Sequence, residues 1–193
     1  MSDRRQMILK VAEELLRHYG VRKTTMGDIA RAAEIGVGTI YIEFSSKDAI
    51  LEELAASRHR HVLECMHQGL SSAEGFAEQF RAMMNARIES FMDLARRGAH
   101  AAELVHCGGC EPVQRAFDDF RGKQHAFLRD FLAQAHASGD ATVDDPELTA
   151  RVILQAYASF SPPDVFEMDD EQRRELLEGT HDLILDGLVR RDD

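Results

Sequence analysis

One pair of cysteines in this sequence could do redox or metal chemistry. Cys107 and Cys110 stand at Cys-x-x-Cys spacing around two glycines, with His106, His100 and Cys65 as further possible ligands. Such thiols either bind a soft metal ion or close a regulatory disulfide. Two cysteines are only half of a tetrahedral zinc site, and the glycines alone would explain a break between helices. We expect reduced, incidental thiols, with metal or thiol sensing as the open alternatives.

A second group of side chains could bind phosphate. Thr39 and Tyr41 can donate hydrogen bonds to phosphate oxygens, and Lys47 adds a positive charge. Thr24 or Thr25 lies where a helix is expected to begin, so a hydroxyl and free backbone amides come together there. These residue types, close together in the chain, indicate contacts with a nucleic-acid backbone.

Short helices are expected to position these groups. Apolar residues at steps of three and four from Ile8 to Tyr19 predict a first helix. Thr25 and Asp28 have the form of a capping box and predict the start of a second. A tight turn then leads to a third helix over residues 37–43. Two short helices joined in this way are a helix-turn-helix, whose second helix enters the major groove of DNA.

The third helix has an inner and an outer face. Ile35, Ile40 and Phe44 supply apolar anchors for the inner face, which leaves small and hydrogen-bonding residues outside. Together with the phosphate-binding groups, the residues expected to meet DNA are Thr24, Thr25, Gly36, Val37, Gly38, Thr39, Tyr41, Ile42 and Lys47.

The charge of the chain is unevenly distributed. A net charge of −11 would by itself argue against binding nucleic acid, because phosphates are neutralised by Lys and Arg. Residues 1–47, however, hold eight Lys and Arg against six Asp and Glu, a balance of +2, whereas residues 48–193 hold fifteen against twenty-eight, or −13. Such asymmetry indicates two functions in one chain. We expect a helix-turn-helix domain over residues 1–47 and a helical second domain over 48–193.

The rest of the sequence also favours helices. Its four prolines all lie at or after Pro112, so more than half of the chain precedes the first proline that would break a helix interior, and no alternating strand pattern or hairpin turn is visible. The fold class expected is therefore all-α, with about nine helices. After the third helix, a long helix is expected to start at Ser45 or Ser46, and another to span about residues 73–96. A short helix should include Leu104, and a longer one should start at Pro112. The last two are expected to span about residues 146–161 and 170–190.

Several of these residues resemble a known family. The runs in question are Thr24-Thr25, Asp28-Ile29-Ala30, Ala33, Gly38-Thr39-Ile40-Tyr41, Phe44 and Ser46-Lys47-Asp48. Across residues 8 to about 54 they resemble the signature of TetR-family repressors. Two positions depart from it: Glu34 stands where the family usually has the turn glycine, and Glu43 where a DNA-contacting tyrosine is common. Acidic groups near phosphates would repel them, so an altered affinity or operator choice is expected.

The resemblance implies a dimeric repressor whose C-terminal domain holds a small-molecule inducer and pairs subunits through its last two long helices. A small apolar ligand would release the protein from its operator by favouring a state that no longer fits DNA. Residues that could line the ligand cavity, or form plain core, are Met83, Met84, Phe91, Phe117, Phe120, Phe127, Phe131 and Tyr157. Residues that could build the dimer seam, or complete the monomer core, are Val152, Ile153, Ala156, Tyr157, Phe160, Leu176, Thr180, Leu183, Ile184 and Leu188.

Other functional classes lack their motifs. No phosphate loop, Gly-x-Ser-x-Gly elbow or His-Glu-x-x-His is present, so we expect neither an enzyme nor a cofactor. No secretion signal is visible and no stretch is apolar enough for a bilayer, which predicts a cytoplasmic protein without a membrane partner. The partners expected are double-stranded operator DNA, a small-molecule effector and a second copy of the chain.

Overall fold

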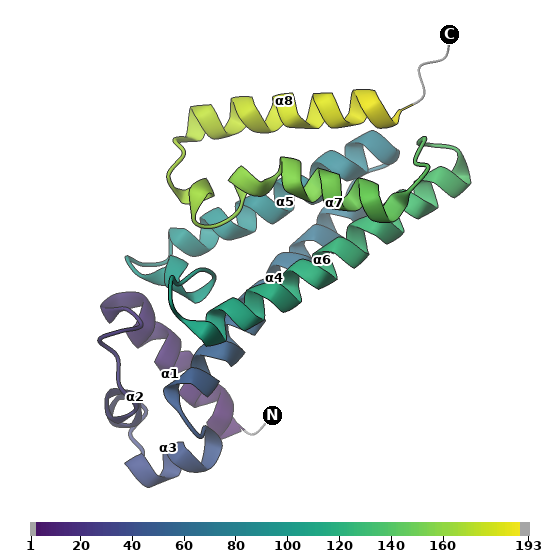
Figure 1. Cartoon of the computed structure of the whole chain (residues 1–193). Coiled ribbons are helices and arrows are strands. Elements are labelled where there is room, and N and C mark those ends of the chain that lie inside the picture. Colours follow the sequence, from purple (N-terminus) through teal and green to yellow (C-terminus); the bar gives the residue numbers. More distant parts are fainter. Residues whose placement is uncertain (1–2, 190–193) are drawn as a thin grey trace. The chain divides into compact units, whose positions relative to one another are not determined.

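The computed structural model describes residues 3–189, and helices dominate this range (Figure 1). It holds eight α helices, three short 3-10 helices and no strand, which confirms the all-α class. The chain divides into two compact units, one formed by Met1–Arg60 and Asp93–Asp119, the other by His61–Met92 and Phe120–Asp193. Within the described range, no helix is both long enough and apolar enough to cross a membrane.

The first unit contains the three expected N-terminal helices, α1 (Asp3–Tyr19), α2 (Met26–Ala32) and α3 (Val37–Glu43). They pack together with the beginning of α4 (Lys47–Ser71), as Figure 1 shows. Their shared apolar core includes Ile8, Leu16, Ile29, Ile40, Phe44, Ile50 and Leu51, all nearly without solvent contact. We call these three helices, with residues 44–60, the head.

Short-range signals set the helix starts in the head. Thr25 Oγ1 accepts a hydrogen bond from the Asp28 amide at 3.2 Å, and Asp28 Oδ2 accepts one from the Thr25 amide at 3.1 Å, so the predicted capping box is confirmed. The hydrogen bonds from Thr25 lower the pKa of the Asp28 carboxyl. Ser46 Oγ accepts from the Ala49 amide at 3.2 Å and caps the start of α4, as expected.

The first unit also includes a segment from much later in the chain. Residues 96–110, which we call the linker, join α5 (Phe76–Ala95) to α6 (Glu111–Ser138). The helix expected around Leu104 is present as η1 (Ala101–Leu104), a single 3-10 turn. The linker is fastened to the end of α1, because the His100 amide donates to the Arg17 carbonyl at 3.1 Å.

The second unit is built from parts of α4, α5 and α6 and from α7 (Pro146–Ala156), η2 (Ala158–Phe160), η3 (Asp164–Phe166) and α8 (Asp170–Leu188). Asp145 accepts from the Leu148 amide at 3.0 Å and Asp169 from the Gln172 amide at 2.8 Å, which confirms both predicted helix starts. Aromatic rings fill the interior: Phe76, Phe80, Phe91, Phe120, Tyr157 and Phe160.

Two helix boundaries differ from the prediction. The helix expected from about residue 73 begins at Phe76, because Gly75 adopts φ +79°, a left-handed conformation that no helix can continue through. The helix expected to reach Ser161 ends at Ala156. Tyr157 leaves helical geometry there and turns its ring into the core beside Phe80, so tertiary packing overrides the local helical pattern. The last helix ends at Leu188, and Arg190, its predicted end, lies outside the described residues.

Polar groups are buried inside the second unit. His181 is 2% exposed; its Nε2 donates to Asn85 Oδ1 at 3.0 Å and its Nδ1 accepts from the Tyr157 hydroxyl. Burial lowers the pKa of His181 to about 4, so the ring is neutral at pH 7. The buried Arg87 donates to the Phe160 carbonyl at 3.2 Å, and burial lowers the pKa of Arg87 to about 10.

Candidate nucleic-acid interface

Helix α3 presents an uncovered face. Ile40 and Phe44 are buried on its inner side, whereas Val37 and Tyr41 are about half exposed and Ile42 is 79% exposed. A Cβ placed on Gly38 would meet no described atom within 4 Å, so the backbone is open to an approaching surface at that position. Large apolar side chains without cover are consistent with a contact surface. Their exposure agrees with the periodicity; their contact with DNA stays a prediction.

The predicted hydroxyls lie in different surroundings. Thr39 is half-buried near the helix start at Gly36. Thr25 is exposed, although its hydroxyl also donates to Asp28 Oδ2 at 2.6 Å. Thr24 is only 2% exposed and its hydroxyl donates to the Gly20 carbonyl at 3.0 Å. Thr24 therefore stabilises the turn between α1 and α2, and its hydroxyl is not presented at the surface.

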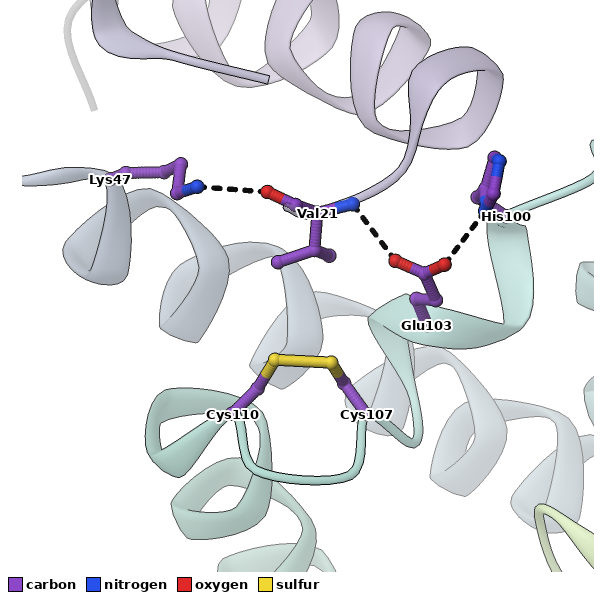
Figure 2. The surroundings of a disulfide bond; sticks show 6 residues. All are labelled: Val21, Lys47, His100, Glu103, Cys107 and Cys110. Carbon is purple, nitrogen blue, oxygen red and sulfur yellow. Dashed lines mark hydrogen bonds and ion pairs between the residues drawn. A yellow bond between two sulfur atoms is a disulfide. The ribbon is translucent and has the colours of Figure 1, made fainter. Parts of the chain in front are cut away.

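Lys47 is also held by the protein. Its Nζ donates to the Val21 carbonyl at 2.8 Å and to the Thr24 carbonyl at 3.1 Å, and the first of these bonds is drawn in Figure 2. An ammonium group has three N–H donors, so at most one remains for a phosphate. The main contact of Lys47 is therefore with the α1–α2 turn, which it ties to the start of α4.

Arg5 positions the far end of α3 and was not predicted as a functional residue. Its guanidinium donates to the Glu43 carbonyl, forms an ion pair with Glu53, and lies 3.9 Å from the centroid of the Phe44 ring. These contacts fasten the last turn of α3 to both α1 and α4. Because the partners are about 40 and 50 residues away in sequence, no local pattern could have indicated them.

Glu34 adopts the conformation for which the family uses glycine. Its φ is +54°, in the left-handed region. Its amide donates to the Arg31 carbonyl at 3.2 Å, and the Ile35 amide donates to the Ala30 carbonyl at 3.0 Å. This pair of bonds is a Schellman motif, the usual way to end a helix before a tight turn. The turn of the helix-turn-helix thus keeps its geometry although Glu34 stands where the family usually has glycine.

Three exposed basic residues flank the exposed Thr25 and were not singled out from the sequence. Arg22 and Lys23 lie in the α1–α2 turn, and Arg31 lies on α2 within 3.5 Å of Asp28. Cations close to a helix start are suited to phosphate contacts. The positive balance of residues 1–47 was the signal that pointed to them.

The eight apolar residues proposed for a ligand cavity are divided between the two units. Phe117 belongs to the first unit, where its ring packs 5.6 Å from His59. The other seven lie in the second unit and are buried, except Phe127, which is half-buried 4.1 Å from the His67 ring. An open cleft of about 620 Å³ in the second unit has a different, polar lining from α5 and α8 that includes Arg81, Asn85, Arg173 and Asp182.

The apolar positions proposed for the dimer seam separate into two sets. Ile153, Tyr157, Phe160 and Leu188 are buried in the second unit. Val152 at 58% exposure and Leu183 at 79%, with Leu176 and Ala156, lie on the surface, and Thr180 and Ile184 are intermediate. The same two helices thus supply monomer core on one side and an uncovered apolar strip on the other.

The expectation of reduced cysteines is wrong for two of the three. Cys107 and Cys110 are joined in a disulfide, as Figure 2 shows, and their Cα atoms are 5.4 Å apart. The thiol of Cys65 is free. The Cys-x-x-Cys loop brings the sulfurs together because its two glycines let the backbone reverse, Gly109 at φ +80°. Across residues 3–189 no group of three or more His, Cys, Asp or Glu side chains has a metal-binding arrangement.

Two short helices joined by a tight turn, the second of them exposed, have the arrangement of a helix-turn-helix, as in DNA-binding proteins. Residues 8–54 match the family model described as bacterial regulatory proteins, tetR family. The uncharacterized HTH-type transcriptional regulator YvdT of Bacillus subtilis (strain 168) is 32% identical over 155 residues, which cover 79% of this chain and 78% of YvdT. The chain belongs to the TetR family and is a transcriptional regulator.

Two further similarities extend this result. The HTH-type transcriptional repressor KstR2 of Mycobacterium tuberculosis (strain H37Rv) is 29% identical over 107 residues, half of this chain and 54% of that protein. The crystal structure of a TetR/AcrR-family regulator from Thermobifida fusca superposes with a TM-score of 0.70 at 24% identity and covers 98% of this chain and all of that one. The fold is therefore shared beyond the head. These relatives are transcriptional regulators, a class distinct from enzymes.

Proposed function

We propose that this regulator is a homodimeric repressor that reads an operator through α3. The observation that carries the proposal is the uncovered face of α3, on which Val37, Tyr41 and Ile42 are exposed while Ile40 anchors the helix from behind. The DNA-binding domain proposed over residues 1–47 supplies this face, and residues 48–193 supply effector binding and dimerisation.

The contacts proposed with DNA are of two kinds. Gly36, Gly38 and Thr39 at the start of α3 allow a close approach to base edges, and Val37 and Ile42 can contact thymine methyl groups. Tyr41, together with Thr25 and the basic residues of the α1–α2 turn, contacts phosphates and sets the register on the duplex. Thr24 and Lys47 act mainly by holding that turn in place.

The proposed dimer joins two chains through α7 and α8. Their uncovered strip, with Val152, Leu176 and Leu183, is the apolar surface that a four-helix seam would bury. A dimer of this type reads two half-sites about one helical turn apart, and a single head buries too little DNA for specific binding.

The proposed inducer is a small apolar molecule bound in the second unit. The interior there is rich in methionine and aromatic side chains, among them Met83, Met84, Phe91, Phe120 and Tyr157, which adapt to apolar ligands. Phe127 and Phe131 stay in the proposed set, and Phe117 is left out because it packs in the first unit. The ligand must bind the state that does not fit the operator more tightly than the state that does.

Selection of DNA from a random duplex pool tests the DNA-binding proposal. We expect the protein to enrich a two-fold symmetric sequence and, in fluorescence anisotropy at fixed salt, to bind it about a thousandfold more tightly than a scrambled duplex. Failure to enrich any sequence, or enrichment of a site without symmetry, would contradict the homodimeric reading of two half-sites.

A second candidate is a thiol-responsive regulator on the same scaffold. The disulfide between Cys107 and Cys110 is the observation that favours it. A metal-responsive form gains no comparable support, because the sulfurs are bonded to each other and no three-ligand group is found across residues 3–189.

A further inference from the structure

We propose that the Cys107–Cys110 disulfide is a reversible redox switch and that the linker transmits its state to the DNA-binding head through Glu103. The proposal rests on the proposed DNA-binding function and adds its regulation. It also names the direction: the disulfide form holds the α1–α2 turn in place and binds the operator more tightly than the dithiol form.

The disulfide loop is open to a small reductant on one side. Cys107 and Cys110 are each half-buried, and a Cβ placed on Gly108 or Gly109 would meet no described atom within 4 Å. The Cys110 carbonyl accepts from the Gln114 amide at 3.0 Å, so Cys110 directly precedes the first turn of α6. The positive end of that 28-residue helix favours a thiolate on Cys110, which makes it the better leaving group.

On the other side, both cysteines pack against the apolar core of the head, together with Leu104 and Val113. The side chain of Glu103 lies on the same linker and reaches the α1–α2 turn: Oε2 accepts from the Val21 amide at 2.8 Å, and Oε1 is paired with His100 Nδ1 at 2.7 Å. Figure 2 shows this chain of contacts above the disulfide.

The turn is thereby held at both backbone groups of one residue. Glu103 binds the amide of Val21 and Lys47 binds its carbonyl, 2.8 Å in each case. Val21 itself is buried, and the turn leads directly into the capping box that starts α2. A change in how the linker is held therefore changes the support of the segment that carries Thr25 and the neighbouring cations.

The redox step uses a dithiol as reductant. One thiolate of the reductant attacks Cys107 Sγ, the Cys107–Cys110 bond breaks, and Cys110 leaves as a thiolate that takes up a proton. The second thiol of the reductant then displaces Cys107, so two protein thiols and the disulfide of the reductant are formed. In the reverse direction, hydrogen peroxide takes two electrons from the two thiols and gives the disulfide and two water molecules.

Anisotropy titrations with the full chain test the proposal. Duplexes are selected separately with oxidised protein and with protein reduced by dithiothreitol, and each is titrated with both forms. We expect reduction to weaken binding by about tenfold. The double variant Cys107→Ser, Cys110→Ser should bind as weakly as reduced wild type under both conditions. Cys65→Ser, the matched control, should keep the full response. Equal affinities for the two forms of the wild type, or tighter binding by the reduced form, overturn the proposal.

The variant Glu103→Ala separates transmission of the redox state to the head from formation of the disulfide itself. Its disulfide should still form, as mass spectrometry can verify, but oxidised Glu103→Ala should bind like reduced wild type and lose the redox response. Glu111→Ala removes a nearby exposed carboxylate of α6 and should leave the response intact. If Glu103→Ala keeps a full redox response, the proposed route through Val21 is wrong.

Hydrogen exchange gives a readout that needs no operator. The Val21 amide should exchange faster by about tenfold after reduction, and by a similar factor in oxidised Glu103→Ala, because its acceptor is lost or released. Unchanged exchange at Val21 on reduction overturns the redox coupling. Failure of both forms to select any duplex, with a redox-dependent Val21 amide, would instead overturn the DNA-binding function and leave the switch standing.

Discussion

The head and the second unit use polar side chains in opposite ways. In the head, Arg5 and Lys47 hold backbone groups of a helix end and a turn in place, and Glu103 of the linker holds the same turn. In the second unit, Arg87 and His181 lie inside the aromatic core. The first arrangement fixes the position of one exposed helix face. The second makes packing depend on the protonation of a buried ring. The polar contacts of the head thus hold backbone groups in place, whereas the polar groups of the second unit belong to its own core.

The prediction with the largest expected effect tests whether the second unit pairs two copies of the chain, so that two heads can bind one operator. Leu183→Asp places a charge on the uncovered strip of α8, where a side chain that is 79% exposed contributes little to the monomer. We expect a folded monomer by sedimentation and a loss of operator affinity of about 100-fold, equal to about 2.7 kcal/mol.

Ala133→Asp, an equally charged change on the exposed face of α6, is the control and should leave the dimer intact. A dimeric Leu183→Asp protein at micromolar concentration would show that α8 does not form the seam.

The second prediction concerns acid stability. Burial lowers the pKa of His181 to about 4, below the value of 6.5 for an exposed histidine. Between these values the unfolded chain binds more protons than the folded one, so stability is lost as the pH falls from 6.5 towards 4 and is constant above that window. At pH 5 we expect His181 to account for about 2 kcal/mol of this loss.

Urea unfolding of His181→Gln, compared with wild type at pH 7 and pH 5, should show a smaller pH-dependent loss of stability. The exposed His61→Gln is the control. His59 in the head is also buried, and burial lowers its pKa to about 4, so a loss should persist in His181→Gln from that residue. If His181→Gln loses as much stability between pH 7 and pH 5 as wild type does, His181 is not buried as a neutral ring in the second unit.

The third prediction returns to the head. Tyr41→Ala should weaken binding by about tenfold, or about 1.4 kcal/mol, to the selected and to a scrambled duplex alike, because a phosphate contact carries no sequence information. Tyr19→Ala, on a side chain of equal exposure on α1, is the control. Anisotropy at one salt concentration measures both. A loss confined to the selected duplex would assign Tyr41 to base recognition instead.

The smallest expected effect lies in the turn between α2 and α3. Glu34→Gly relieves a left-handed conformation that costs a residue with a Cβ about 1 kcal/mol, so we expect a stabilisation of about 0.5 to 1 kcal/mol in thermal unfolding. Glu34→Ala removes the charge and keeps the strained backbone, which separates the two contributions. An operator affinity that rises equally in both variants would show that charge, and not turn geometry, limits DNA binding.

The sequence predicted the head more accurately than the second unit because different distances along the chain decide their structures. Thr25, Asp28 and the helix-ending turn act within a few residues, so the boundaries of α2 and α3 could be predicted. The end of α7 is set by Tyr157, whose ring packs against Phe80 far earlier in the chain, and no local pattern reports such a contact.

The candidate site shows the same division. Periodicity placed Ile40 inside and Val37, Tyr41 and Ile42 outside. It could not show that the amine of Lys47 is bound to two carbonyls or that Arg5 holds the end of α3, because both depend on tertiary contacts. The spacing of Cys107 and Cys110 left a disulfide among the open alternatives, but spacing alone could not decide whether the two thiols are oxidised.

The contacts of Arg5 and Glu103 also set an order of events during synthesis. Arg5 emerges from the ribosome early but finds its partner only when Glu53 has been made. The Val21 amide gains its acceptor only when Glu103 has been made, 82 residues later, which takes about 4 to 16 seconds at usual translation rates. The nascent head must therefore pass through a period in which α1, α2 and α3 exist without the contact that closes their turn.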